Sequence, residues 1–563
     1  MLQTDLPLFA TVRRNQFLEV VAQAARMEHH IRAHPSSILV SFINEPRPEA
    51  AGKPHRFVLR EEMEKMFEMC IAAVRQQNPD RVIKCVDGDY DPPAKFGMPD
   101  NHCYCGWYIG HGIDLGAVHH GDWLPVKPGW HYGCGEFGAE GLDSFEVMQK
   151  YYPATWRPHG LDAPWSPDVI ARAQSWGFHF LWYDTPRTTA EWIEASQKHQ
   201  DWIVRMMTEA YRRNAMMNSF AVHLFIDAWP AGWMKTIMDV ARVPKKAWFT
   251  YRDVLTPTAV SLRCDRTSVW SGESVPIELW VCNDRAETLK RWQVHYDVRW
   301  QGTVVANGTV PAQIDACAPR GQGIIEVTAP ETVQRGIMEI GASLINQEGR
   351  TVHDTTLTIK VFPAPAAAEG KVWLSRRTRA GVNFVRSLGL HESSGAVANA
   401  QTLFITDHES YQSQSSEIQQ QVREGACAVF LSLPPGKYTI GGSPIEVRKA
   451  GMGPRHFVSR ATGHPLVEGF DPDDFKFWYS HRLGRVVPIL HTTLDAVGWR
   501  PILQSGDGEW LHPWNYAPAA VERADGNGCW RVCQVELAEC VKTNPAARLF
   551  ALRLLAPQKD AAG

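Results

Sequence analysis

Two glutamates, Glu45 and Glu136, each close a short segment that has the length of one β-strand. Glu45 follows Asn44 at the end of the apolar run Ile38–Ile43, whose β-branched residues favour a buried strand. Glu136 comes just after the strand-like segment Trp130–Cys134. In a parallel α/β barrel the carboxyl ends of the strands form the catalytic face. Two carboxyl groups at that face, about 5–5.5 Å apart, are what retaining glycoside hydrolysis requires.

Retaining hydrolysis gives its two carboxyl groups different roles. One acts as an acid and then as a base, and the other is the nucleophile. The alternative for either residue is a solvated loop glutamate, which is where most glutamates lie. Glu140, four residues after Glu136, is the alternative nucleophile. This chemistry needs no cofactor, and we expect none.

The motifs around the two glutamates resemble those of glycoside hydrolase family 2, which contains β-galactosidases, β-mannosidases and β-glucuronidases. Three motifs carry the resemblance in the family's order: His34-Pro35-Ser36, Asn44-Glu45-Pro46 and Glu136-Phe137-Gly138. The resemblance covers roughly residues 1–255, and Gly135 stands where the family usually has a serine. It implies a retaining exo-β-glycosidase with Glu45 as the acid/base and Glu136 as the nucleophile.

The resemblance also implies a carbohydrate substrate. β-Galactosides are the first expectation, followed by β-mannosides. A β-glucuronidase is less expected, because the sequence after the last barrel strand is Val243-Pro-Lys-Lys-Ala, without an Asn-x-Lys to bind a sugar carboxylate. The alternative from another class is a catalytically incompetent fragment or split partner whose other domains act in assembly or glycan binding.

Further site residues follow from the resemblance. Asn44 would donate a hydrogen bond to the sugar 2-hydroxyl, a contact that strengthens in the transition state. Tyr104 would orient Glu136 and balance its charge by hydrogen bonding. Trp229 would form the floor of the sugar pocket, and Asp5 would hold sugar hydroxyls. Three more residues would line the site: His102, Trp107 and Asp227.

No metal site is expected. The histidines clustered near residue 120 lack the spacing and the fourth donor of a zinc site. If residues 101–108 form a strand, alternation turns Tyr104 to the barrel interior and Cys103 and Cys105 towards the helices. Thiols that face outward in this way are more often small core residues than ligands.

The resemblance implies that residues 1–253 are a catalytic domain with the fold of a (β/α)8 barrel of TIM type. Its first strand-like segment, residues 1–9, resembles the family's third strand, so we expect about six of eight strands and an amino-terminally incomplete barrel. Open edges would expose the interior, so we expect weak activity from the chain alone. We expect its partner to be a missing amino-terminal half or a second copy of the chain in a homo-oligomer. The expected elements are helices 14–33, 58–77, 167–176 and 189–213 and strands 38–43, 81–86, 101–108, 130–134 and 221–226.

The pattern changes after the barrel. Residues 254–363 hold short alternating runs between Gly, Asn and Asp turns, which predict an immunoglobulin-like β-sandwich. Residues 364–563 return to strand–helix alternation and resemble a flavodoxin-like or glutamine-amidotransferase-like α/β domain with a parallel sheet. An amidotransferase needs a cysteine at a glycine-flanked elbow, but Pro434-Pro435-Gly436 follows the strand expected at 428–433, so this domain is expected to be non-catalytic. The chain is therefore predicted to be a multidomain protein of α/β and β class.

Composition excludes several classes of function. The 563 residues carry a net charge of −3, which gives no attraction to nucleic acid or to an anionic membrane surface. No apolar stretch reaches the ~18–20 residues of a membrane-spanning helix, and the first residues lack the pattern of a signal peptide. The 12 cysteines show no disulfide framework, so we expect a reducing, cytoplasmic location.

Overall fold

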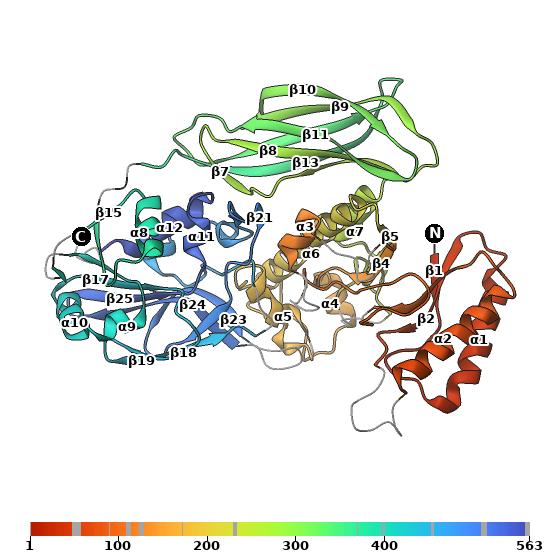
Figure 1. Cartoon of the computed structure of the whole chain (residues 1–563), viewed down its shortest axis with the longest axis horizontal. Helices are drawn as coiled ribbons and strands as arrows, with labels where there is room; N and C mark the ends of the chain where they lie inside the picture. Colours follow the sequence, from red (N-terminus) through yellow and green to blue (C-terminus); the bar gives the residue numbers. More distant parts are fainter. Residues whose placement is uncertain are drawn as a thin grey trace.

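The structure is a computed structural model of the chain (Figure 1). It describes residues 2–47, 58–88, 90–107, 114–122, 129–171, 173–228, 234–366, 368, 370–393, 396–397, 400–451, 455–507 and 515–557. An α/β region, a β-sandwich and a second α/β region follow one another along the chain. Within the described ranges, every helix is too short or too polar to cross a membrane.

Parallel strands form the base of the amino-terminal region: β1 (Leu2–Asp5), β2 (Ser37–Asn44), β3 (Val82–Asp87), β4 (Tyr132–Phe137) and β5 (Met217–Val222). β1, β2 and β3 pair in that order, and β4 pairs with β5. Isolated parallel bridges from Asp100 to Gly133 and from Cys103 to Phe137 place residues 100–103 alongside β4. Among the described residues, β1 pairs only with β2 and β5 only with β4, so these strands form two parallel sheets, one of three strands and one of two.

Helices cover the outer face of these strands (Figure 1). α1 (Phe17–Ile31) precedes β2 and α2 (Arg60–Arg75) precedes β3. Ala24 of α1, Met66 of α2 and Val40 of β2 are fully buried in one core. α6 (Thr189–Arg212) precedes β5 and begins with a capping box that involves Thr188 and Glu191. The other helices of this region are α3 (Leu115–His120), α4 (Phe145–Tyr151), α5 (Ser175–Phe178), α7 (Lys246–Val254), and the 3-10 turns η1 (Arg14–Gln16), η2 (Pro167–Val169) and η3 (His179–Leu181).

Three predicted elements of this region are wrong in extent. Residues 167–176 do not form one helix, because the backbone becomes extended at Ile170, between η2 and α5. The last strand is β5 rather than residues 221–226, because its pairing with β4 begins at Met217. Residues 101–108 form no continuous strand: after the bridge at Cys103 the chain turns, and the Trp107 amide donates to the Tyr104 carbonyl at 2.9 Å.

The central region is a sandwich of two sheets, drawn as two layers at the top of Figure 1. The sheets have the orders β10-β9-β12-β13-β7 and β11-β8-β6, and all pairs are antiparallel except β13 with β7. Alternate residues such as Ile277, Val294 and Ile340 are fully buried between the sheets, as period-2 patterning requires. The strands are β6 (Thr258–Arg263), β7 (Ser268–Trp270), β8 (Ser274–Asn283), β9 (Leu289–Trp300), β10 (Thr303–Ile314), β11 (Ala318–Thr328), β12 (Gly336–Ile345) and β13 (Thr351–Phe362).

The carboxyl-terminal region is built on a seven-stranded sheet of order β15-β14-β16-β17-β25-β24-β23. Its strands are β14 (Lys371–Leu374), β15 (His391–Glu392), β16 (Thr402–Ile405), β17 (Cys427–Leu431), β23 (Arg500–Asp507), β24 (Asn515–Asp525) and β25 (Gly528–Cys533). The prediction of a parallel sheet holds for the pairs from β15 to β25 and is wrong for β24 and β23, which pair antiparallel. The tight turn at Gly526, between β24 and β25, permits only an antiparallel pair.

Helices lie on both faces of this sheet. Side chains of α8 (Arg379–Ser387) and α12 (Pro545–Leu555) belong to one apolar core, and those of α9 (His408–Gln412) and α10 (Ser415–Glu424) belong to another. The remaining elements are α11 (Leu537–Cys540), the turns η5 (Pro465–Val467) and η6 (Pro472–Phe475), and the strands β18 (Gly436–Ile440), β19 (Ser443–Lys449), β20 (Tyr479–Ser480), β21 (Arg485–Val486) and β22 (Thr492–Asp495).

Candidate active site

Glu45 follows the last residue of the buried strand β2, just before Pro46 ends the extended run. Its backbone has a φ of 44°, which is uncommon for a residue with a side chain and is found disproportionately at functional sites. The Glu45 amide donates to the carbonyl of Asp87 at 2.8 Å, so the neighbouring strand β3 holds this backbone in place. The side chain is 24% exposed and therefore reaches solvent from a fixed base.

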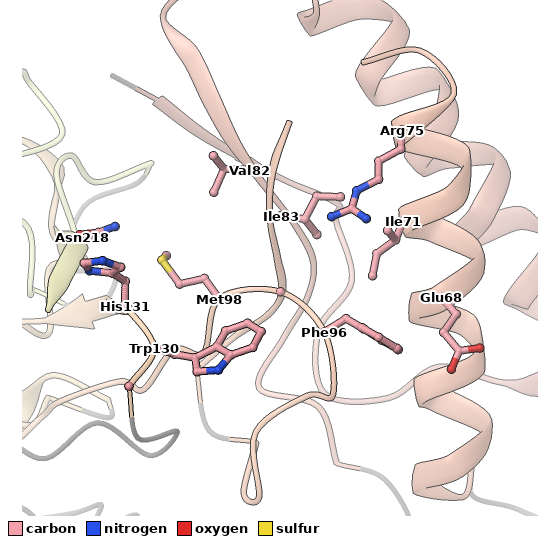
Figure 2. A pocket seen from close by; sticks show the side chains of 12 residues that line it. Glu68, Ile71, Arg75, Val82, Ile83, Phe96, Met98, Trp130, His131 and Asn218 are labelled. Atoms are coloured by element: carbon pink, nitrogen blue, oxygen red, sulfur yellow. The ribbon is translucent and has the colours of Figure 1, made fainter. Parts of the chain in front are cut away.

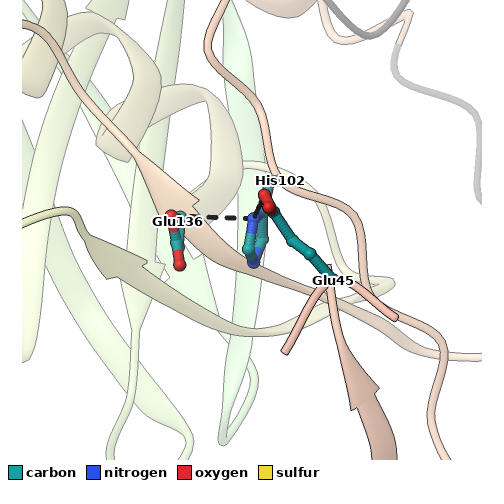
Figure 3. A group of neighbouring side chains, drawn as sticks. All are labelled: Glu45, His102 and Glu136. Carbon is teal, nitrogen blue, oxygen red and sulfur yellow. Dashed lines mark hydrogen bonds and ion pairs between the residues drawn. The ribbon is translucent and has the colours of Figure 1, made fainter. Parts of the chain in front are cut away.

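Glu136 is the last residue but one of β4, and Gly135 directly precedes it. Its carboxyl group faces that of Glu45, and an oxygen of each lies within 4.8 Å of the other. His102 lies between the two glutamates (Figure 3). The His102 Nδ1 atom is 2.8 Å from Glu45 Oε1 and 3.6 Å from Glu136 Oε2. Two carboxyl groups from different strands thus share one buried imidazole.

Hydrogen-bond donors surround Glu136. The Tyr104 hydroxyl donates to Oε2, and the Asn44 amide donates to Oε1 at 3.4 Å. His223, directly after β5, places Nδ1 3.5 Å from Oε2. Burial raises the pKa of Glu136, while the charge of His102 and the Tyr104 hydrogen bond oppose that rise. Burial lowers the pKa of His223 to about 3, so this ring is neutral.

His102 is a cation at neutral pH. Its side chain is fully buried, which by itself would lower its pKa. Interactions with Asp87 and Glu45, and the charges of Glu136 and Asp100, outweigh burial and raise the pKa of His102 to about 10. The imidazolium therefore balances part of the negative charge of the two glutamates.

Two groups of side chains have the spacing of cation ligands. Glu45, His102 and Glu136 form one group, and Asp87, Asp100 and His102 form the other. Protonated His102 has no lone pair for a metal. In the second group the Lys84 ammonium already donates to both aspartates, so these donors form a network of ion pairs.

Gly135 departs from the serine of the resembling family for a steric reason. A Cβ atom at this position would lie 1.8 Å from Asp87 Oδ1. The Asp87 carboxylate therefore fills the space that a serine side chain would need, and only glycine fits beside it.

Other predicted site residues lie at different distances from the glutamates. Asp5 is exposed at the end of β1 and shares the Gln3 amide with Asp87. Trp107 is buried behind Tyr104, with ring centroids 5.3 Å apart, so it does not line an open surface. Trp229 lies outside the described residues.

Two acids belong to other surroundings. Asp227 accepts the Thr236 hydroxyl at 2.8 Å and belongs to a cluster after β5. Burial raises the pKa of Asp227, and the nearby Lys245 charge opposes part of that rise. Glu140, the alternative nucleophile, is buried and accepts the Gln174 amide at 3.3 Å. Glu136, rather than Glu140, faces Glu45.

Four residues near the glutamates were not predicted from the sequence: Lys84, Asp100, His223 and Lys235. His223 would have been found by the strand-end rule if the end of β5 had been placed correctly. Lys84 carries a signal, because it is a lysine within an otherwise apolar strand. Asp100 and Lys235 lie in irregular segments and have no pattern that distinguishes them.

A pocket of about 650 Å³ opens at the opposite end of the strands (Figure 2). It lies beside Ile71 of α2, Val82 at the start of β3 and Trp130 just before β4. Because catalytic groups of α/β barrels lie at the carboxyl ends of the strands, this pocket is not where the chemistry of Glu45 and Glu136 takes place.

Comparison of the sequence with models of protein families gives no match, and comparison with curated proteins gives none either. Among solved structures, the chain is similar to a β-D-mannosidase from Dictyoglomus thermophilum, with 14% identity and a TM-score of 0.46 over 66% of this chain and 44% of that one. It is also similar to the exo-chitosanase CsxA of Amycolatopsis orientalis, with 12% identity and a TM-score of 0.41 over 62% of this chain and 39% of that one.

A third similar structure is a β-glucuronidase from Bacteroides uniformis, with 15% identity and a TM-score of 0.30 over 65% of this chain and 39% of that one. The chain spans less than half the length of each of these structures. The function proposed below rests on the geometry of the two glutamates.

Proposed function

We propose that this chain is a retaining exo-β-glycosidase in which Glu45 is the acid/base and Glu136 is the nucleophile. The observation that carries the proposal is the approach of the two carboxyl groups to within 4.8 Å at the carboxyl ends of parallel strands. Retaining enzymes hold these groups about 5–5.5 Å apart, whereas inverting enzymes leave ~6.5–9.5 Å for a water molecule.

The surroundings of each glutamate support this division of roles. Tyr104 and Asn44 donate to different oxygens of Glu136, which fixes the direction of the lone pairs that a nucleophile must aim. The Glu45 side chain is 24% exposed, against 15% for Glu136. A base that activates water must be open to solvent, so the more exposed residue suits the acid/base role.

The reaction then proceeds in two displacements. Glu45 gives a proton to the leaving oxygen while Glu136 attacks the anomeric carbon, so a glycosyl–enzyme ester forms as the glycosidic bond breaks. Ionised Glu45 next removes a proton from water as the water oxygen attacks the anomeric carbon. The ester bond to Glu136 breaks, and the sugar leaves with its configuration retained. The His102 cation lies between the two carboxylates and reduces their repulsion. No cofactor takes part.

Azide rescue tests the two roles. In Glu45→Ala, azide should restore turnover of a substrate with a good leaving group and give the β-glycosyl azide, because the nucleophile is intact. In Glu136→Ala, any rescue should give the α-azide, because azide then replaces the nucleophile. Glu140→Ala is the matched control and should give no glycosyl azide. The opposite pairing of products would exchange the two assignments.

β-D-Galactosides are our first choice of substrate and β-D-mannosides our second, each tested as an aryl glycoside. One observation favours a second candidate function, that of a split partner with little activity of its own. Among the described strands, β1 and β5 each pair on one side only, which leaves the barrel open between them. Activity that appears only when a second polypeptide supplies further strands would favour this alternative.

A further inference from the structure

A buried lysine lies beneath the two glutamates. Lys84 is in the middle of β3, and its side chain has no exposed area. Its ammonium donates to Asp87 Oδ1 and to Asp100 Oδ2, each at 2.8 Å. A buried charge is costly unless it is paired and hydrogen-bonded, so this lysine is kept in place by two carboxylates rather than by packing alone.

The two aspartates hold the backbone beside each glutamate. Asp100 Oδ1 accepts the amides of Gly88 at 2.9 Å and of Gly135 at 3.1 Å. Gly135 directly precedes Glu136. The Asp87 carbonyl accepts the Glu45 amide at 2.8 Å. One ammonium is therefore connected to the backbone beside both glutamates. The Asp100 carboxylate leads to the Gly135 amide, and Asp87 binds Lys84 with its carboxylate and Glu45 with its main-chain carbonyl.

Asp87 also contacts His102 and β1. His102 Nε2 is 3.6 Å from Asp87 Oδ1, on the side of the ring away from Glu45. The Gln3 amide of β1 donates to Asp87 Oδ2 at 2.9 Å. The network thus joins β1, β3, the 100–103 segment and β4 below the site.

The glycines of β4 make room for this network. A Cβ atom at Gly133 would lie 2.6 Å from Asp100 Oδ2, and one at Gly135 would lie 1.8 Å from Asp87 Oδ1. The alternating glycines before Glu136 are thus explained by the carboxylates that Lys84 binds. This is an observation independent of the ion pairs themselves.

We propose that Lys84 is a positioning residue for the proposed glycosidase reaction: through Asp87 and Asp100 it fixes the backbone beside Glu45 and Glu136, and its charge offsets that of the two aspartates beneath Glu136. This inference rests on the proposed function. Lys84 touches neither glutamate and acts on them through the two aspartates.

The charges around Lys84 determine in which direction its removal changes the protonation of Glu136. Lys84 itself is surrounded by Asp87, Asp100 and, more distantly, Asp5 and Cys134. Removing its positive charge leaves the site more negative, which favours protonation of Glu136; removing the charge of Asp100 has the opposite effect. The charged and titratable groups around Glu136 itself are Glu45, Asp87, His102, Tyr104, His223 and Lys235.

The experiment compares pH profiles of kcat/KM for the wild-type chain, Lys84→Met and Asp100→Asn on one aryl β-glycoside. Lys84→Met should move the acidic limb to higher pH by roughly one unit, and Asp100→Asn should move it to lower pH. The double variant should return towards the wild-type limb. Lys198→Met, on the exposed surface of α6, is the matched control and should leave the limb in place.

Shifts in the same direction, or no shift in either variant, would overturn the proposal, because a purely structural role predicts no opposed movement of the limb. If Lys84→Met does not fold, the single Asp100→Asn variant decides: its side-chain oxygen can still accept the Gly88 and Gly135 amides, so it should fold, and an unmoved limb refutes the proposal.

Hydrogen exchange gives a readout that needs no activity. In Lys84→Met, peptides that contain Glu45 and Gly135 should exchange faster than in the wild-type chain, while the sandwich at 258–362 should be unchanged. Unchanged exchange at both peptides would refute the positioning role. A wild-type chain that hydrolyses no aryl β-glycoside would instead refute the proposed function. The hydrogen-exchange result would then still decide whether Lys84 positions the two peptides.

Discussion

Replacing Tyr104 by phenylalanine removes one hydroxyl group that donates to Glu136. Tyr104 is 5% exposed, so water does not readily replace the lost donor. The hydrogen bond lowers the pKa of Glu136 against the effect of burial. Its loss must therefore raise that pKa, and the acidic limb of kcat/KM, which requires ionised Glu136, should move to higher pH.

The size of the shift follows from the hydrogen bond. A hydrogen bond to a charged group contributes about 1.5–3 kcal/mol, and about 1.4 kcal/mol corresponds to one pKa unit. Asn44 and the His102 cation remain near the same carboxylate, so the shift should be near the lower value, roughly one unit. Below the limb, kcat/KM should fall about tenfold, and above it the loss should be smaller.

The assay is the pH dependence of kcat/KM on an aryl β-glycoside. Tyr132→Phe is the matched control, because Tyr132 is a buried tyrosine on the same strand as Glu136 and its hydroxyl accepts the Asn214 amide at 2.7 Å. That variant should leave the limb where it is. A limb that stays in place in Tyr104→Phe, or moves to lower pH, would show that Glu136 is not the group whose ionisation is being followed.

Three further predictions concern stability and the last domain. The pKa of His102 is raised to about 10, so its protonation stabilises the fold fully below its unfolded pKa near 6.5, and this contribution is lost as the pH rises to about 10. The fall in Tm between these two pH values should therefore be smaller in His102→Gln than in the wild-type chain. An equal fall in Tm in both proteins would contradict this prediction. Gly135→Ser should destabilise the chain by about 1–3 kcal/mol in urea unfolding because of its contact with Asp87. Gly160→Ser should be neutral, because a Cβ atom there would meet only the Ala163 Cβ, at an ordinary contact distance of 3.9 Å. Burial raises the pKa of Cys533 to about 12, so ammonia release from glutamine should stay at background, and a rate abolished by Cys533→Ser would disprove the non-catalytic assignment.

The elements that sequence reasoning placed well are those in which local pattern and tertiary packing agree. The strand expected at 38–43 is β2, and both ends differ by one residue. From Leu39 to Ile43 its apolar run is buried on both faces, so composition defines most of it. Helix 189–213 is α6, whose Thr188 and Glu191 form a recognisable amino-terminal cap. In such segments the local signal contains most of the information.

The misplaced elements are those whose limits are set by neighbours. Residues 221–226 are as apolar as a strand, but β5 ends at Val222 because its hydrogen-bonded partner β4 ends there, at Phe137. This error of four residues hid His223 from the strand-end rule. Residues 101–108 alternate correctly for Tyr104, yet the chain turns after it, so the side chain reaches Glu136 from a bridge and not from a strand.

The charges under the site could not be predicted, because they pair across strands without a fixed spacing. Lys84 and Asp100 are 16 residues apart and meet only because residues 100–103 lie alongside β4. A single sequence shows a lysine in a strand and an aspartate in a loop, each of which is ordinary alone. Whether Lys84 and Asp100 meet depends on how the 100–103 segment is aligned with the neighbouring strands, and a short sequence pattern does not specify that alignment.

The position of the two glutamates and the exclusion of water from the site depend on different parts of the barrel. The positions of Glu45 and Glu136 depend on hydrogen bonds within the described strands, from the Asp87 carbonyl and the Asp100 carboxylate. These contacts do not involve the open edges of β1 and β5. Exclusion of water does depend on those edges, since Asp5 stands at one and His223 follows the other. The carboxyl spacing should therefore persist in the open barrel, whereas the desolvation that raises carboxyl pKa values for acid catalysis should increase when the gap is covered.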